Sequence, residues 1–439
     1  MAQAIFEIIH GLLYGNGIRI GRLSPSARVI ATMMGNHADV VPFMGPQIHD
    51  HAMTVARVPA RKYYFDAELL VDVQVAVQQW YGFDTFSVIP DAYNFEVEAL
   101  GAKMVYSNDA MPTVDTSQPL IKERADLDRI GTLDPSKGRI PMGIEVARLI
   151  TKKVPPPFDF GFFCSPFSLI CQTMGYPKAV RALRKDKAFA QELFSFAENQ
   201  AIFPYVKAQA NAGVKQSIGA DAWAAFPNLT PEMVEEWVIP SAKRLQARGK
   251  RELKMRVMAA QAAADYCEED PAKFDKEIMF KCWSVAGKIL FLNVALSAMG
   301  RTQDWNMEWF QEFAVKNGKF GRKLPIDASL NGRFVRDSTP EQIVDKIREW
   351  IDIMGRDGRL VFFIGNVPAD TPPINIHTAL YAVHTLGRYP IVKDLSSITI
   401  KPPDFKSFDE WVKDRPEADT IFKAREQNRE PKGLAAPFP

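Results

Sequence analysis

The chain carries at residues 86–102 the stretch Phe86-Ser87-Val88-Ile89-Pro90-Asp91-Ala92-Tyr93-Asn94-Phe95-Glu96-Val97-Glu98-Ala99-Leu100-Gly101-Ala102. Its first four residues form a short apolar run that is typical of a buried strand, and Asp91 comes where the run ends. A short helical segment follows and stops at Gly101. In α/β folds, functional side chains gather at the C-terminal ends of parallel strands. Asp91 is therefore a candidate functional residue.

Short apolar runs alternate with longer amphipathic segments along the rest of the chain, a pattern typical of a parallel α/β protein. Two helices are especially clear, at 231–245 and 340–354, and each begins with a Thr-Pro pair. The eight β-then-α units predict a TIM-type (β/α)8 barrel rather than a doubly wound sheet. The predicted strands are 40–44, 85–89, 158–164, 214–221, 253–259, 289–294, 324–329 and 360–364.

The barrel is expected to occupy residues 1–400, with a C-terminal extension at 401–439. Residues 106–157 are weakly periodic and rich in proline, which predicts an insertion beside the mouth of the barrel. The extension begins at a Pro-Pro pair and contains one predicted helix, at 409–413. We expect its end, 425–439, to be a flexible or draped tail.

Composition excludes several classes of protein. The 439 residues include 54 basic and 52 acidic ones, and no basic block predicts a nucleic-acid surface. Four cysteines without a C-x-x-C pair are too few for a disulfide framework and favour a reduced, cytoplasmic setting. The N-terminus lacks the features of a signal peptide, and no apolar run reaches the roughly 18 residues of a membrane span. We expect a cytoplasmic protein without a membrane or nucleic-acid partner.

Further motifs follow in a fixed order and resemble the uroporphyrinogen decarboxylase superfamily, which includes porphyrinogen decarboxylases and methyltransferases that exchange methyl groups with corrinoid proteins. The resemblance covers most of residues 18–388 and implies a TIM-type barrel independently of the strand pattern. Together with the stretch around Asp91, it rests on Val40-Val41-Pro42-Phe43-Met44, Ser165-Pro166-Phe167-Ser168-Leu169, Gly219-Ala220-Asp221-Ala222, Ser338-Thr339-Pro340-Glu341 and Asp370-Thr371-Pro372-Pro373-Ile374-Asn375-Ile376-His377.

Departures from the decarboxylase pattern favour the corrinoid branch. The decarboxylases carry an arginine-bearing loop after the first strand, whereas this chain has Met44-Gly45-Pro46-Gln47-Ile48-His49. A polycarboxylate substrate needs cations that glutamine and histidine do not replace at neutral pH. The family's tyrosine falls near Gln172 and its histidine near Asn366, so only Asp91 remains of the expected catalytic groups.

The zinc site of many corrinoid-linked methyltransferases is also not expected. Those enzymes use a His-x-Cys pair at the end of the fifth strand and a later cysteine. Here the fifth strand ends Met258-Ala259-Ala260-Gln261 and the last ends Gly365-Asn366, without a soft donor. We find no match to the Glu/Glu/His set of aryl-ether demethylating members. No corrinoid-binding Asp-x-His-x-x-Gly segment is present, so the cobalamin is expected on a partner protein.

Asp91, His49 and His51 are the candidate catalytic residues. A carboxylate at a strand end can anchor a cation or act as a general base, or it can merely cap the next helix. In an extended loop, His49 and His51 would point the same way toward a metal or a substrate oxygen, or they could make ordinary polar contacts. The candidate substrate-binding residues are Gln47, Cys164, Gln172, Asp221, Trp223, Asn331 and Asn366.

The sequence thus predicts a methyltransferase that moves a methyl group between a small methylated substrate and a separate corrinoid protein. One alternative is a lyase or decarboxylase that acts on a small acid or a tetrapyrrole-like substrate. Another is a non-catalytic subunit of a methyltransferase complex, because all three expected zinc positions are lost. A homo- or hetero-oligomer is compatible with each of these hypotheses.

Overall fold

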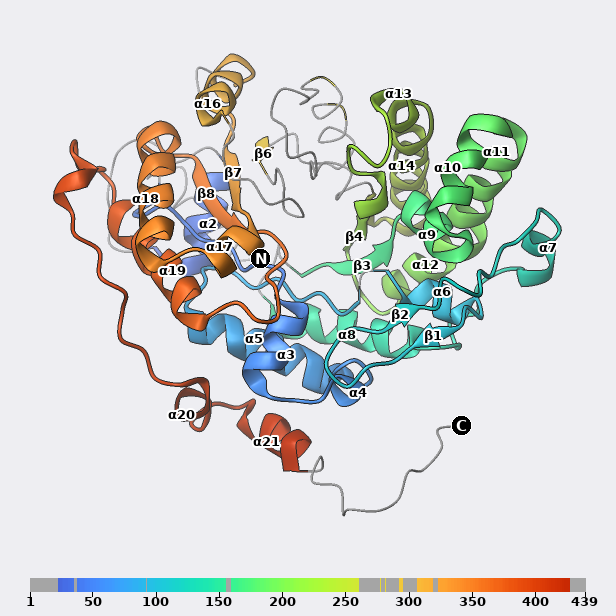
Figure 1. Ribbon diagram of the computed structural model, residues 1–439, viewed down its shortest axis with the longest axis horizontal. Helices are drawn as coiled ribbons and strands as arrows, with labels where there is room; N and C mark the ends of the chain where they lie inside the picture. Colours follow the sequence, from blue (N-terminus) through green and yellow to red (C-terminus); the bar gives the residue numbers. More distant parts are fainter. Residues whose placement is uncertain are drawn as a thin grey trace.

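The computed structural model describes residues 23–34, 38–91, 93–154, 159–259, 277, 281, 292–294, 306–318 and 323–426. Within them, helices surround short parallel strands, and the strands run through the middle of the molecule (Figure 1). The strands form two three-stranded parallel sheets. The first contains β3 (Gly161–Cys164), β4 (Gln216–Ala220) and β5 (Arg256–Met258), and the second contains β6 (Leu292–Val294), β7 (Ile326–Leu330) and β8 (Leu360–Ile364).

Two extended segments lie between these sheets. Residues 40–44 join the second sheet, because Phe43 forms a parallel bridge to Phe362 and Met44 N–H donates to the Phe362 carbonyl at 2.8 Å. Residues 85–89 follow, with Asp84 N–H donating to the Phe43 carbonyl at 2.9 Å. The segment 85–89 forms no strand, so the described residues show an α/β arrangement but no closed barrel.

The predicted strands are therefore confirmed in part. The one at 360–364 has the predicted bounds, and five others are shorter than predicted or, at β7, shifted toward the C-terminus. The predictions at 158, 260–261 and 289–291 fall outside the described residues. Leu253 was wrongly placed in a strand, because it ends a continuous helical rod. That rod comprises α13 (Pro231–Met233), η3 (Val234–Val238), α14 (Ile239–Arg248) and η4 (Gly249–Leu253).

Both predicted helices are confirmed, together with their caps. Thr230 accepts from the backbone of Met233 at the start of α13. Thr339 and Gln342 form a reciprocal capping box at the start of α18 (Pro340–Trp350), which η7 (Ile351–Gly355) continues. Their buried faces pack against neighbouring helices and strands, as the apolar spacing predicts.

The predicted insertion at 106–157 is wrong in its second half. Residues 140–153 form α8 (Ile140–Lys153), which packs along α5 (Ala67–Tyr81) as a regular outer helix. Pro141 stands in the first turn, where proline is tolerated, and Gly143 lets Phe95 and Tyr205 approach the helix closely. The preceding part holds the short antiparallel pair β1 (Met104–Val105) and β2 (Thr113–Val114), and α7 (Asp126–Ile130).

The C-terminal extension folds back onto the N-terminal helices. α20 (Phe408–Val412) and α21 (Ala418–Glu426) pack on α5, and both lie below α3 in Figure 1. Trp80 donates its indole N–H to the Lys406 carbonyl at 2.9 Å, and Arg425 donates to the Ala56 carbonyl at 2.6 Å. The expected loose tail is thus wrong for residues 425 and 426, which belong to α21, whereas 427–439 lie outside the described residues.

No helix within the described ranges combines the length and apolar character needed to cross a membrane. The remaining elements are α2 (Pro25–Met33), α3 (His49–Ala56), α4 (Ala60–Tyr63), α6 (Phe95–Ala99), α9 (Pro166–Met174), α10 (Tyr176–Lys185), α11 (Lys187–Phe196), η1 (Ala197–Ile202), α12 (Phe203–Asn211), η2 (Ala222–Ala224), α16 (Met307–Lys316), α17 (Gly332–Asp337), α19 (Pro373–Leu386) and η8 (Leu395–Ser397).

Candidate functional site

Two glutamine side chains hold the segment that leads to Asp91. Gln78 accepts from Ser87 N–H at 2.9 Å and donates to the Ser87 carbonyl at 3.1 Å. Gln74, one turn earlier on α5, accepts from Ile89 N–H at 3.0 Å and donates to the Ile89 carbonyl at 2.8 Å. These amides satisfy the backbone groups that a neighbouring strand would otherwise pair. The segment therefore stays extended without a ladder and brings Asp91 to its end.

Asp91 is buried, with only 2% of its surface exposed, and both of its carboxylate oxygens are engaged. Oδ1 accepts from the backbone of Tyr93 at 3.3 Å and of Asn94 at 3.2 Å, and from the Asn94 side chain at 2.7 Å. Oδ2 receives a hydrogen bond from Arg139 at 2.8 Å. Asp91 thus holds the turn before α6, as the capping alternative proposed, and is also one member of a buried ion pair.

Arg139 bridges two carboxylates. It contacts Asp91 through Nη2 and Glu98 through Nε, the latter at 2.5 Å. Its guanidinium also lies over the ring of Phe95, 4.9 Å from the centroid. Burial opposes its charge, but the Asp91 and Glu98 carboxylates outweigh that effect and raise the pKa of Arg139. The positive charge is therefore fully compensated inside the protein.

Glu96 is a buried acid at this site that the sequence reasoning missed. It is 1% exposed, and its Oε1 accepts from the backbone N–H of Cys164 at 2.8 Å. Burial raises the pKa of Glu96 to about 8, and the nearby Asp91 adds to the shift. Glu96 is therefore mainly protonated at neutral pH. The Glu-x-Glu pattern after the predicted strand was the available signal, but helical spacing alone did not show which glutamate faces inward.

Asp221 occupies the corresponding place after β4. Its Oδ1 accepts from the backbone N–H of Ser168 at 3.0 Å and from the Ser168 hydroxyl at 2.8 Å. Burial raises the pKa of Asp221 to about 7, although both hydrogen bonds act against this shift. The contact ties the end of β4 to the first turn of α9.

Cys164 lies among these acids at the end of β3. It is completely buried, and its thiol donates only a long contact to the Ser165 carbonyl, at 3.7 Å. Burial raises the pKa of Cys164 well above its ordinary value, and the carboxyl groups of Glu96 and Asp221 raise it further. The residue is a neutral core thiol at physiological pH, not a nucleophile.

The expected convergence of His49 and His51 is wrong. Both belong to α3, not to an extended loop, and side chains two residues apart on a helix point to different sides. His51 is fully buried, 2.7 Å from the Tyr81 hydroxyl and 3.3 Å from the Ala369 carbonyl. Burial lowers the pKa of His51 to about 4, so it is a neutral core residue.

His49 is the histidine associated with Asp91. The residue as a whole is partly exposed, but its Nδ1 atom is buried and has no hydrogen-bond partner among the described residues. Burial of the ring lowers the pKa of His49, while the charges of Asp50 and Asp91 and the Ile89 carbonyl act in the opposite direction. His49 is therefore a neutral imidazole beside the carboxylate network.

The other predicted binding residues divide between two regions. Gln172, on α9, is partly buried, and Trp223, after β4, is 38% exposed. Gln47, Asn331 and Asn366 follow the strands of the second sheet. Asn331 is buried and caps α17, whereas Asn366 is exposed and Gln47 is partly buried. The structure brings Asp91, Glu96, Cys164 and Asp221 together, but Gln47, Asn331 and Asn366 form a separate group.

No group of three or more histidine, cysteine, aspartate or glutamate side chains among the described residues has an arrangement that could hold a metal ion. Met258 is buried at the end of β5, and Asn366 follows β8. Gln261, Cys267 and Cys282 lie outside the described residues.

Comparison with known proteins gives the chain a family. A methyltransferase structure from Methanosarcina mazei aligns with a TM-score of 0.61 at 16% identity, over 82% of this chain and 98% of that one, which shows a shared fold. A B12-independent methionine synthase from Shewanella sp. aligns with a TM-score of 0.39 at 15% identity, over 76% of this chain and 89% of that one. No curated protein sequence matches the chain. The family model for uroporphyrinogen decarboxylase (URO-D) matches residues 24–386, and the chain belongs to that family.

Proposed function

We propose that the chain is a methyltransferase that moves a methyl group between a small substrate and a corrinoid carried by a separate protein. Membership of an enzyme family that resembles both decarboxylases and methyltransferases supports this proposal. The similarity in fold to the Methanosarcina mazei methyltransferase is consistent with it. In such a reaction the cobalt of the corrinoid accepts or supplies the methyl group.

The observation that carries the proposal is the charge around Asp91. Arg139 is buried and already paired with Asp91 and Glu98, so it is not available to a substrate carboxylate. The loop 44–49 has no lysine or arginine, and the pKa of His49 is lowered by burial. A site in which the described cation Arg139 is already paired disfavours a polycarboxylate and favours a neutral or cationic methyl compound.

His49 is proposed as the group that exchanges a proton with the substrate. The atom that loses a methyl group gains a proton, and the atom that receives one loses a proton. A neutral imidazole with an unpartnered nitrogen can take up a proton, and the nearby Asp91 stabilises the resulting imidazolium. Asp91 is thus a positioning residue, because its own oxygens remain bound to Arg139 and Asn94.

The family also supports a closed barrel. In that arrangement, the two three-stranded sheets and the segments 40–44 and 85–89 would form one eight-stranded parallel cylinder. Asp91, Cys164 and Asp221, which lie at or just beyond the ends of three of these segments, would then lie at one end of the cylinder. This is the end at which barrel enzymes bind their substrates.

The test is a methyl-transfer assay with free cob(I)alamin as the acceptor. Methanol, methylamines, methyl thiols and aryl methyl ethers are supplied in turn, and methylcobalamin formation is followed by absorbance. We expect one donor class to support turnover and His49→Ala to slow it by about a hundredfold. Carbon dioxide release from uroporphyrinogen would contradict the proposal. Turnover that requires a second, related chain would instead identify a non-catalytic subunit.

A further inference from the structure

The rod formed by α14 and η4 carries a concentrated positive charge. Apolar and small residues separate the cations along the chain, whereas the helix brings them together on its exposed sides. Seven cations and one acid stand between residues 243 and 256, although the whole chain has a formal net charge of only +2. We call the following residues the basic face: Lys243, Arg244, Arg248, Lys250, Arg251, Lys254 and Arg256.

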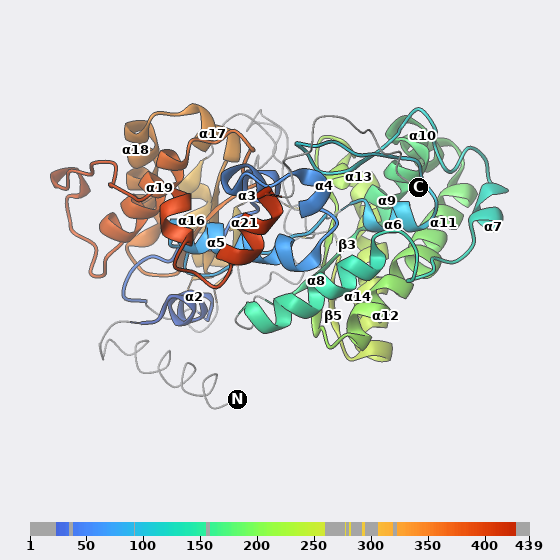
Figure 2. The ribbon, with the colours of Figure 1, turned by 90° about the horizontal axis from the view of Figure 1, so that it is seen from below.

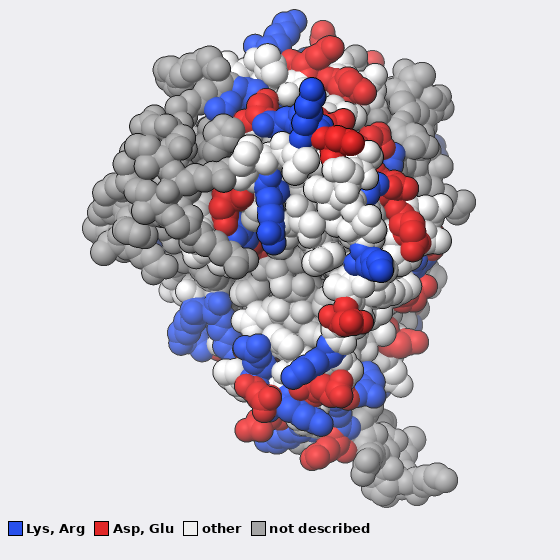
Figure 3. Space-filling model, turned by 90° about the vertical axis from the view of Figure 1, so that its left-hand side faces the viewer, with Lys and Arg blue, Asp and Glu red and all other residues white. Residues whose placement is uncertain are grey.

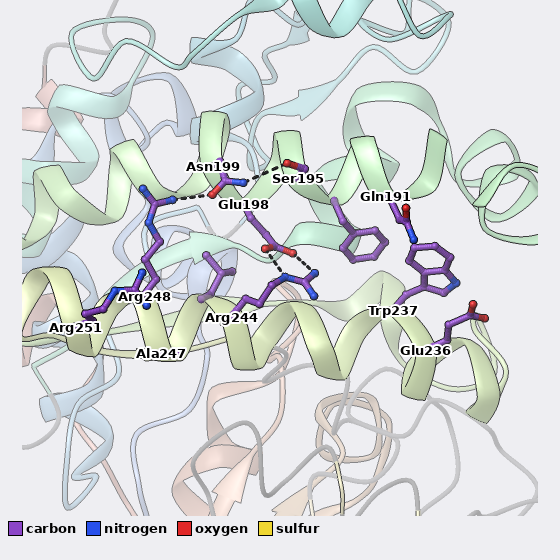
Figure 4. A pocket seen from close by; sticks show the side chains of 12 residues that line it. Gln191, Ser195, Glu198, Asn199, Glu236, Trp237, Arg244, Ala247, Arg248 and Arg251 are labelled. Carbon is purple, nitrogen blue, oxygen red and sulfur yellow. Dashed lines mark hydrogen bonds and ion pairs between the residues drawn. The ribbon is translucent and has the colours of Figure 1, made fainter. Parts of the chain in front are cut away.

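A groove of about 670 Å³ lies between this rod and the helix formed by α11 and η1. Figure 4 shows the arginines along one wall and polar side chains of the facing helix along the other. The spacing on both walls is that of successive helical turns, so the two rows run beside one another. The walls carry Arg244, Arg248 and Arg251 on one side, and Gln191, Ser195 and Asn199 on the other.

The groove also has an apolar part. Phe194 and Trp237 stack with ring centroids 5.6 Å apart, and Leu245 lies beside them. Trp237 is 7% exposed, and its indole N–H has no hydrogen-bond partner among the described residues. The groove therefore combines an apolar strip with a cationic wall and an unused donor.

The anions of this region only partly balance its cations. Arg244 is paired with Glu198 at 2.6 Å, whereas Arg248 and Arg251 share the single carboxylate of Glu252. Within the described part of the chain, the lysines of the basic face form no ion pair. Lys243, Lys250 and Lys254 line a second hollow of about 690 Å³ on an adjoining side of the same rod.

The cationic end of the rod lies away from the proposed reaction site. Arg256 N–H donates to the Lys215 carbonyl at 3.0 Å, which places this end at the start of β4, whereas Asp221 follows the end of that strand. The five residues of β4 separate the two ends by about 15 Å. Figure 2 shows α12, α14 and β5 together at one edge of the molecule. On the face shown in Figure 3, by contrast, cations and anions are intermixed.

We propose that the groove beside the basic face docks an acidic amphipathic helix of a partner protein. Carboxylates on one side of such a helix would meet Arg248 and Arg251, and apolar side chains would enter the strip at Trp237. Glu198 and Glu252 stand inside the same region and would repel a continuous phosphate backbone. Among the described residues that line the groove, Trp237 and Phe194 are 7% and 2% exposed, which leaves an apolar contact area but no open ring face on which a base could stack.

The test measures binding of a fluorescent synthetic helix with glutamates on one face and leucines on the other. The first variant, Arg248→Glu/Arg251→Glu, reverses the two charges on the wall of the groove that the carboxylates of the helix would meet. The second, Ser195→Trp, fills the groove without changing the charge, since Ser195 is exposed on its wall. We expect each variant to weaken binding by about tenfold or more and added salt to weaken wild-type binding. Melting temperatures confirm that both variants fold.

The matched control is Lys393→Glu/Lys401→Glu, which makes the same change in net charge at exposed positions of the C-terminal region. It should bind the acidic helix like wild type. An equal loss in the control would reduce the effect to overall charge and overturn the proposal. So would preferential binding of a single-stranded oligonucleotide or of phosphatidylserine vesicles, unimpaired binding by Ser195→Trp, or no binding of the acidic helix by the wild-type protein.

Discussion

Replacing Asp91 by asparagine separates a helix cap from a buried ion pair. The amide oxygen of the new side chain can still accept from the backbone N–H groups of Tyr93 and Asn94, which Asp91 bonds at 3.3 and 3.2 Å. A residue that only capped the turn would therefore tolerate the change with little loss of stability. The other oxygen, however, is replaced by an NH₂ group that faces the guanidinium of Arg139. Two hydrogen-bond donors, the new NH₂ group and the Arg139 guanidinium, then face each other in the protein interior without an acceptor between them.

The size of the effect follows from the burial of this pair. The side chains of Arg139 and Asp91 are 4% and 0% exposed, and removal of one partner of a buried pair costs about 3–5 kcal/mol. Arg139 keeps its ion pair with Glu98 at 2.5 Å, so we expect the loss of stability in Asp91→Asn to be near the lower end of this range, at about 3 kcal/mol. Arg139→Met leaves the carboxylates of Asp91 and Glu98 without their cation, and we expect the free energy of unfolding to fall by about 4–5 kcal/mol.

Urea denaturation of the two single variants and the double variant measures both effects at pH 7. Because Asp91 and Arg139 are in direct contact, the loss in the double variant should be smaller than the sum by about 1–3 kcal/mol. A loss below about 1 kcal/mol for Asp91→Asn, the range of an ordinary cap, would refute the ion-pair argument. Strict additivity of the two losses in stability would refute the ion-pair argument as well. Turnover per folded molecule then shows whether Asp91 also positions His49.

Three further changes test the remaining assignments. Burial raises the pKa of Glu96 from 4.5 to about 8, so between these pH values the folded state holds a proton that the unfolded state releases. The stability of the wild-type protein should therefore fall as the pH rises from 5 to 8. Glu96→Gln should show a smaller difference in stability when urea unfolding is compared at pH 5 and pH 8. His51→Phe should lower the melting temperature through loss of the Tyr81 contact but leave turnover per folded molecule unchanged, whereas His49→Ala should do the reverse; a turnover defect in His51→Phe would contradict the core assignment. Gln78→Leu leaves the backbone N–H and carbonyl groups of Ser87 without their partner and should lower the free energy of unfolding by about 2–4 kcal/mol. Urea unfolding measures this loss, and a loss under about 1 kcal/mol would contradict the assignment.

Features written in local sequence patterns could be predicted. The apolar run 360–364 forms β8 with the same bounds, because a parallel strand that is buried on both faces is visible in the sequence as a continuous apolar run. The Thr-Pro starts marked both long helices, because a side-chain cap and a proline in the first turn act within a few residues. The acidic residue at the end of 85–89 was found for the same reason.

Features that depend on distant residues could not be predicted. Arg139 reaches Asp91 across 48 positions of sequence, and Gln78 replaces a strand partner for Ser87 from a helix. Neither contact leaves a local signal. The histidine pair failed for a different reason, because two residues after a strand were assumed to be extended when α3 had already begun at His49.

The burial of the acids limits what they can do chemically. Glu96 and Asp221 each accept a backbone N–H, from Cys164 and Ser168, and these bonds join α6 to β3 and α9 to β4. An acid that is 1% exposed and holds such a bond cannot reach a substrate without breaking the local structure. Direct proton exchange therefore falls to a group whose polar atom no hydrogen bond from the described residues occupies. The Nδ1 atom of His49 is buried but has no partner within the described structure, and the nearby charge of Asp91 favours protonation of the ring. The buried acids hold the strand ends in place, and the adjacent imidazole is where we expect the chemistry to occur.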